Sequence, residues 1–276
     1  MSWKPRSEES GHRHVSHLCR VRQHSGQNFV LEILRAAPRK TCSSNYSFSL
    51  ANTLHFISNA GAIDLAWHPN DDAVYIAMGR SLSVFSDAGG LRDVASGCRR
   101  ISRVRHMSDR NLLCAAYACG EMCVIDERLP AGTGHVLRRS AGKPIFIDDF
   151  CFLRDEQQMA VSSFDHRLEL WDRRGGSSGC VVHSYSGHVN DGERGLGLAV
   201  HGTSLVAALG TDGLVRLWNV NTAASLSSVR IGRQPLSAAC FPWWSPLADD
   251  PRASFSFFTC NLSSDGMKLQ WFSPHL

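Results

Sequence analysis

A repeated strand pattern is the sequence feature that most constrains the fold. Short apolar or alternating segments recur in groups of three, and the last segment of each group carries a large apolar residue at one position. These anchor residues lie 40 to 53 residues apart: Phe85, Ile125, Trp171, Trp218 and Trp271. A period of roughly 40 to 45 residues is typical of four-stranded repeat units, and short insertions account for the longer intervals. The sequence therefore predicts an all-β repeat protein.

Five repeat units are recognisable, each with three expected strands separated by turn residues. The strands are expected at 62–69, 72–79 and 81–87; 101–108, 111–118 and 121–127; 146–153, 158–164 and 167–172; 196–202, 204–210 and 214–220; 236–244, 254–261 and 267–273. Two further strands are expected nearer the N-terminus, at 28–36 and 44–56. No stretch combines 3.6-residue periodicity with helix caps, which argues against an α/β fold.

Composition limits the class of protein. A chain of 276 residues with 43% hydrophobic residues can bury a sizeable core. Its ten cysteines include no C-x-x-C pair, which indicates reduced, buried thiols in a nuclear or cytoplasmic protein that is not secreted. The first residues lack the apolar segment of a signal peptide, and no apolar run is long enough to span a membrane. The net charge of +4 is too small to argue for nucleic acid.

Aspartates at a fixed spacing strengthen the repeat. Asp165, Asp212 and Asp265 each precede a unit's tryptophan, Trp171, Trp218 or Trp271, by the same interval, and Gly187-His188 precedes the fourth unit. This pattern resembles WD40 repeats. The resemblance implies a β-propeller with degenerate repeats, built from five recognisable blades plus N-terminal strands, and either incomplete or closed by the N-terminus. It also implies that the aspartate, the tryptophan, a strand hydroxyl and His188 form a buried hydrogen-bond network. No hydroxyl is evident in the second strand of the fourth unit, LVAAL.

Two domains are expected: a flexible basic tail at residues 1–27 and the propeller at residues 28–276. The tail holds imidazole and thiol groups of the kind that bind zinc, at His12, His14, His17, Cys19 and His24. Their spacing is not that of a paired zinc-finger site. We therefore expect neither a metal ion nor a cofactor.

An Asp-x-Arg pattern follows the third strand of two consecutive units. The third unit ends in Trp171, Asp172, Arg173 and Arg174, and the second ends in Ile125, Asp126, Glu127 and Arg128. Charged residues are common in turns, so a single copy would mean little. Two copies in register favour a functional role for Arg128 and Arg174, because guanidinium groups suit planar recognition at interfaces. Arg173 fills the variable position of the pattern.

Trp-Asp-x-Arg resembles the docking signature of WD40 substrate receptors of cullin-4 RING ubiquitin ligases. The segment Ser184–Asp191, SYSGHVND, is also similar to members of this family. The resemblance is specific over residues 146–220. It implies that Asp126, Arg128, Asp172 and Arg174 bind the ligase adaptor and that Trp171 packs in the core. Ile125 departs from the signature, which weakens the first copy.

The expected function is therefore that of a non-catalytic substrate receptor, whose partners are the cullin-4 ligase adaptor and a protein substrate. Enzyme motifs such as a P-loop or G-x-S-x-G are missing from the sequence. Asp148 and Asp149 are adjacent carboxylates, but neighbours on a strand point to opposite faces. Two alternatives stay open. One is a WD40 scaffold of another complex that binds a peptide on its disc face. The other is a nucleic-acid binder, which depends on the basic strand that contains Arg99, Arg100, Arg103 and Arg105.

Overall fold

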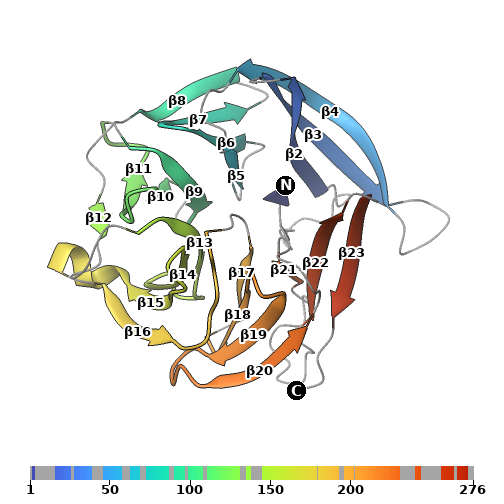
Figure 1. Cartoon of the computed structure of the whole chain (residues 1–276). Coiled ribbons are helices and arrows are strands. Elements are labelled where there is room, and N and C mark those ends of the chain that lie inside the picture. The colour runs from blue at the N-terminus through green and yellow to red at the C-terminus, as the bar shows by residue number, and fades with distance from the viewer. Residues whose placement is uncertain are drawn as a thin grey trace. The chain divides into compact units, whose positions relative to one another are not determined.

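Strands occupy the expected positions in the computed structural model (Figure 1). The structure describes residues 2–3, 16–25, 28–38, 46–57, 63–68, 73–86, 90–96, 99–107, 111–130, 135–137, 145–178, 180–192, 196–201, 203–230, 240–243, 256–263 and 266–272. Side chains are described between residues 64 and 230, except in the gaps and at residues 96 and 176–178. The chain divides into two compact units, residues 1–115 with 124–134, and residues 116–123 with 135–276.

The first unit begins with a sheet of four sequential antiparallel strands. Its members are β1 (Ser2–Trp3), β2 (Ser16–Ser25), β3 (Asn28–Pro38) and β4 (Tyr46–Ile57). The two strands predicted nearest the N-terminus correspond to β3 and β4. Strand β2 pairs with β3 along its length, from Ser16 opposite Ala36 to Ser25 opposite Asn28. The sheet thus includes residues that the sequence assigned to a flexible tail.

The second sheet has the same sequential order. It consists of β5 (Ile63–Trp67), β6 (Ala73–Met78), β7 (Ser81–Ser86) and β8 (Gly90–Ser96). The third sheet, which contains residues of both units, consists of β9 (Ile101–His106), β10 (Leu112–Tyr117), β11 (Met122–Asp126) and β12 (His135–Leu137). In the first unit, β5 lies against both β1 and β9, so the first strands of successive sheets are neighbours.

The second unit continues the series. One sheet contains β13 (Ile147–Phe152), β14 (Gln158–Ser163), β15 (Leu168–Asp172) and β16 (Val181–Tyr185), and the next contains β17 (Leu198–His201), β18 (Leu205–Leu209), β19 (Leu214–Asn219) and β20 (Ser225–Arg230). A three-stranded sheet follows, with β21 (Cys240–Trp243), β22 (Ser256–Ser263) and β23 (Gly266–Phe272). Strand β17 lies against β13 and β21.

The all-β class predicted from the sequence is confirmed. Within the described residues the only helix is the short 3₁₀ helix η1 (Arg173–Ser178). None of the residues that the structure describes belongs to a helix of the length and apolar character needed to cross a bilayer.

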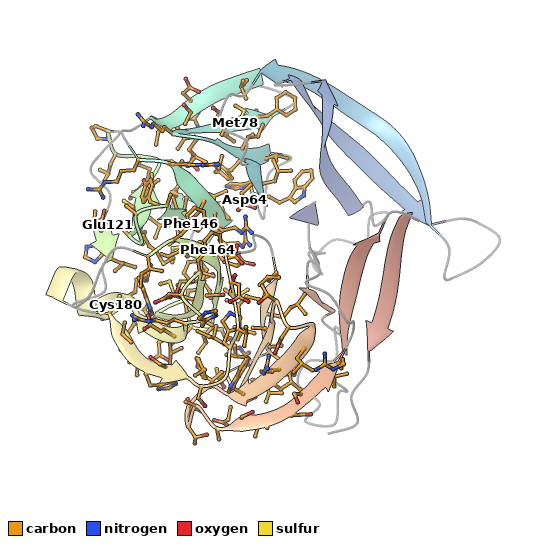
Figure 2. The ribbon with its side chains drawn as sticks, in the orientation of Figure 1. Asp64, Met78, Glu121, Phe146, Phe164 and Cys180 are labelled. Atoms are coloured by element: carbon orange, nitrogen blue, oxygen red, sulfur yellow. The ribbon has the colours of Figure 1, made fainter. Side chains whose placement is uncertain are left out.

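Apolar side chains of the strands form the cores of the sheets. In the second unit, one cluster surrounds the fully buried Trp218 and includes Leu168, Leu170 and Val206. The indole Nε1 of Trp218 donates a hydrogen bond to the carbonyl of Ser186 at 2.9 Å, so its single polar atom is satisfied. The rings of Phe146 and Phe164, labelled in Figure 2, stack at the start of β13 with centroids 4.3 Å apart.

Replacement of Trp218 by alanine should strongly destabilise the fold. It leaves a large cavity between two sheets and removes the hydrogen bond to Ser186, for which we expect a loss of about 3 to 5 kcal/mol. Leu226→Ala on the exposed strand β20 is the matched control and should change stability by about 0.5 kcal/mol or less. Urea unfolding followed by circular dichroism measures both. Similar unfolding midpoints for the two variants would contradict this account of the core.

Candidate functional site

The first Asp-x-Arg segment forms a tight turn directly after β11. The Oδ1 atom of Asp126 accepts the backbone N–H of Arg128 at 3.0 Å and its Nε at 2.8 Å, while Oδ2 accepts Nη2 at 2.6 Å. The backbone N–H of Glu127 donates to the carbonyl of Asn111 at 3.0 Å, and that of Leu129 donates to the carbonyl of Asp126 at 3.1 Å. One carboxylate therefore both caps the turn and holds the guanidinium group.

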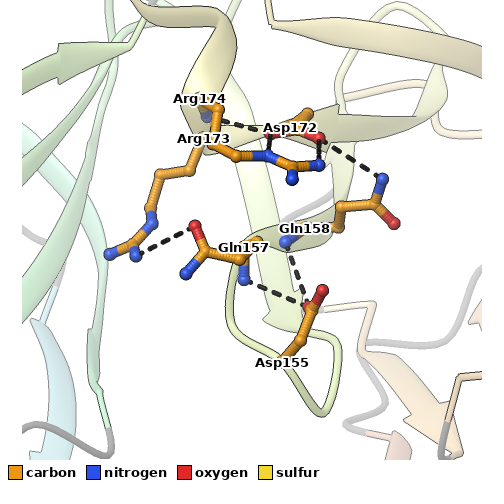
Figure 3. A network of polar contacts seen from close by, with 6 residues as sticks. All are labelled: Asp155, Gln157, Gln158, Asp172, Arg173 and Arg174. Atoms are coloured by element: carbon orange, nitrogen blue, oxygen red, sulfur yellow. Dashed lines mark hydrogen bonds and ion pairs between the residues drawn. The ribbon is translucent and has the colours of Figure 1, made fainter.

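The second segment forms the same turn after β15 (Figure 3). Asp172 Oδ1 accepts the backbone N–H and the Nε of Arg174, each at 2.9 Å, and Oδ2 accepts Nη2 at 2.5 Å. The backbone N–H of Arg173 donates to the carbonyl of Gln157 at 2.8 Å, at the position equivalent to the Glu127 to Asn111 bond. The two copies that are in register in the sequence thus have matching local geometry.

A third turn shows which part of this geometry belongs to the fold. After β19, Asn219 Oδ1 accepts the backbone N–H groups of Asn221 at 2.9 Å and of Thr222 at 3.0 Å. Val220, the middle residue of this turn, donates its backbone N–H to the carbonyl of Ser204 at 2.8 Å. This bond is equivalent to those that Glu127 and Arg173 donate to Asn111 and Gln157. A side-chain oxygen that accepts from the backbone two residues on is a common way to form a turn. The cap therefore serves the fold, and the turn forms without an arginine.

Electrostatics follows from the paired geometry. Hydrogen bonds from the side chain and then the backbone of Arg128 lower the pKa of Asp126 to about 2. The side chain of Arg174 likewise holds the pKa of Asp172 well below its ordinary value, and Asp172 raises the pKa of Arg174. The arginine side chains are 60% and 69% exposed, whereas their aspartates are 19% and 18% exposed. In each turn the cation faces solvent and the carboxylate lies beneath it.

The middle residue of each turn has a role that the sequence did not indicate. Arg173 was assigned as a variable position, yet its Nη2 atom donates to Oε1 of Gln157 at 3.4 Å (Figure 3). In the first turn, Glu127 accepts a hydrogen bond from the buried Tyr75 hydroxyl and forms an ion pair with Arg92. The first turn is therefore attached to residues of β6 and β8, and the second turn to Gln157, directly before β14.

His188 belongs to a smaller network than the WD40 resemblance implied. Its Nε2 atom is hydrogen-bonded to Ser162 Oγ at 3.0 Å, and both side chains are buried. Ser162 lies in β14, the second strand of the third sequence repeat. The hydroxyl partner of His188 therefore comes from the third repeat, not from the second strand of the fourth repeat. Trp171, which was expected to share a network with His188, donates its Nε1 hydrogen bond to Glu169 at 3.0 Å. Burial of the Ser162–His188 pair indicates a structural role.

The aspartates expected in that network have other partners, which is a correction. Asp165 accepts from Ser163 Oγ at 2.8 Å and pairs with Arg167 Nε at 2.6 Å. Asp212 forms a two-pronged ion pair with Arg216, at 3.0 and 2.5 Å. Each carboxylate therefore pairs with the guanidinium group of its own hairpin, Arg167 or Arg216, and neither is hydrogen-bonded to the His188 imidazole. Asp265 and the side chain of Trp271 lie outside the described residues.

The remaining sequence candidates are not assembled into a site by the part of the chain that the structure describes. Arg105 pairs with Asp64 at 2.9 Å, and the same carboxylate accepts the backbone N–H of Val104 at 2.7 Å, so β9 uses part of its basic face to contact β5. Asp148 and Asp149 are both buried. The described side chains contain no cluster of metal-binding groups. His12 and His14 lie outside the described residues.

Comparison of the sequence with models of protein families gives no match, and comparison with curated proteins gives none. The assignment of a function therefore depends on the geometry of the two arginine turns.

Protonation of His188 should make stability depend on pH. Burial, together with the nearby Arg216, lowers the pKa of His188 to about 4 from an ordinary 6.5. Between these values the unfolded chain binds a proton that the folded chain does not, so the free energy of unfolding falls as pH falls from 6.5 to 4, by about 3 kcal/mol at most. In His188→Gln the free energy of unfolding, measured by urea titration at several pH values in this window, should depend less on pH than in the parent protein. An unchanged pH dependence in His188→Gln would refute this role.

Substitutions of Asp172 should separate the cap from the ion pair. Asp172→Asn retains an oxygen that accepts the Arg174 backbone N–H, so we expect a stability change well under 1 kcal/mol, because the lost ion pair is exposed. Asp172→Ala removes the cap as well and should cost about 1 kcal/mol. Thermal unfolding compares the two variants, and equal losses would show that the cap contributes nothing.

Proposed function

We propose that this chain is a WD40-type β-propeller that serves as a substrate receptor of a cullin-4 RING ubiquitin ligase. In this proposal Arg128 and Arg174 contact the ligase adaptor, and the chain presents a protein substrate. It does no chemistry itself. Binding brings a substrate lysine close to the ubiquitin-charged enzyme, which raises the effective concentration of the reacting groups.

The arrangement of strands supports the propeller part of this proposal. Successive four-stranded antiparallel sheets follow the chain in simple order, and within each unit the first strands of successive sheets are neighbours. Propeller blades have this organisation. The repeat period in the sequence agrees with it.

The single observation that carries the docking assignment is the matched geometry of the two turns. A turn at this position forms with asparagine alone, as Asn219 shows, so stability does not require Arg128 or Arg174. Each guanidinium is nevertheless held by two side-chain hydrogen bonds and remains exposed. An arginine fixed before binding loses less conformational entropy when it binds, which favours tight, directional contacts.

Adaptor capture tests the proposal. The double variant Arg128→Ala/Arg174→Ala should reduce capture of purified cullin-4 adaptor to background, since exposed arginines at the centre of an interface are frequent hot spots. The matched control is Arg80→Ala/Arg230→Ala, which removes one exposed arginine from each unit away from the Asp-x-Arg turns. Both variants should keep the unfolding midpoint of the parent protein. Undiminished capture by the Arg128/Arg174 variant would exclude the docking role.

A further inference from the structure

We propose that Arg92 and Leu129 extend the docking surface of the first turn, and that this surface binds a partner carboxylate flanked by an aliphatic side chain. The inference rests on the proposed function and specifies the chemistry of the adaptor surface that meets the first turn. Sequence reasoning missed both residues, because Arg92 belongs to the preceding repeat unit and Leu129 follows the Asp-x-Arg pattern.

Glu127 brings Arg92 to the turn. The Nη2 atom of Arg92, on β8, lies 3.3 Å from Oε2 of Glu127, while Oε1 of Glu127 accepts the hydroxyl of Tyr75. Tyr75 is 1% exposed, so the hydroxyl that holds Glu127 belongs to the core of the second sheet. A buried anchor thereby fixes the carboxylate that holds Arg92 at the turn that contains Arg128.

The charges around the first turn form two layers. The side chains of Arg92 and Arg128 are each 60% exposed, whereas Glu127 is 14% and Asp126 is 19% exposed. The carboxylates lie inward and the guanidinium groups outward, so the outer layer is positive although the four charges sum to zero. A carboxylate on a partner would meet two guanidinium groups that are already oriented, and charge-assisted hydrogen bonds of this type are strong when water is excluded.

Leu129 supplies the apolar part of the surface. Its side chain is 52% exposed immediately after Arg128, and its backbone N–H is bonded to the carbonyl of Asp126 at 3.1 Å. A single exposed leucine is unremarkable in itself. In the same turn as the exposed Arg128, and with Arg92 held at that turn by Glu127, it supplies the apolar part of a surface that fits an acidic residue next to an aliphatic one.

The second turn lacks both features. Arg173 takes the place of Glu127 and contacts Gln157, and Gly175 takes the place of Leu129. The first turn departs from the docking signature at Ile125. In this proposal, Arg92 and Leu129 give the first turn contacts with the partner that the second turn does not make. The two turns therefore recognise different parts of the partner.

Affinity for the purified adaptor, measured by calorimetry with the full chain, tests this inference. We expect about 5- to 10-fold weaker binding for Arg92→Ala and for Leu129→Ser, and a partial recovery for Arg92→Lys. Leu226→Ser and Arg80→Ala are matched controls at exposed positions and should bind like the parent protein. Because Arg92 and Arg128 would share one carboxylate, the double variant Arg92→Ala/Arg128→Ala should lose less than the sum of the single changes.

The Nε–H signal of Arg128 in NMR spectra separates a contact role from a structural one. If it is unchanged in Arg92→Ala while affinity falls, Arg92 contacts the partner directly. Parent-like affinity of Arg92→Ala, or a loss accompanied by a disrupted Arg128 signal, would overturn the inference. If Arg92→Ala binds normally and Arg128→Ala does not, only this inference fails. If Arg92→Ala and the Arg128→Ala/Arg174→Ala variant both bind normally, the proposed function fails as well.

Discussion

A hydrogen bond from the backbone to a side-chain oxygen two residues earlier ends the third strand in three of the described sheets. Asp126, Asp172 and Asn219 supply the oxygen. The bond fixes the direction in which the chain leaves the strand, and a second bond attaches the middle residue to the start of the neighbouring strand. The orientation of Arg128 and Arg174 depends on this constraint, because the same carboxylate that caps the turn holds the guanidinium group.

Strand positions were predictable because the three apolar segments of each repeat are separated by turn residues, and in the four repeats between residues 62 and 220 the described side chains of these segments are mostly buried. The fourth strands, β8, β12, β16 and β20, were not located by the sequence. In β20, with the sequence SLSSVR, most side chains are exposed, so neither burial nor an apolar period marks it. Strand β2 was missed for a related reason, since its polar sequence gave no apolar period. Its pairing with β3 is what defines it as a strand.

The sequence could predict those parts of the candidate site whose contacts join residues close together in the chain. Asp-x-Arg at one repeat position implied a turn, and the contacts from Asp126 to Arg128 and from Asp172 to Arg174 span only two residues. The contacts of Glu127 with Tyr75 and Arg92 join residues far apart in the sequence, and no pattern relates them. The partners of Asp165 and Asp212 were misassigned because Arg167 and Arg216, a few residues further along the chain, pair with these carboxylates. Repeat spacing alone does not reveal that competition.

The asparagine-capped turn after β19 has a consequence for how this chain can change over evolution. Asn219 accepts the backbone N–H of Asn221, and Asn221 occupies the position that is arginine in the other two turns. Gain or loss of an arginine at this position therefore leaves the backbone bonds of the turn in place. A recognition residue can appear in one repeat and disappear from another at little cost to folding, so selection can act on the set of contacts separately from the architecture that carries them.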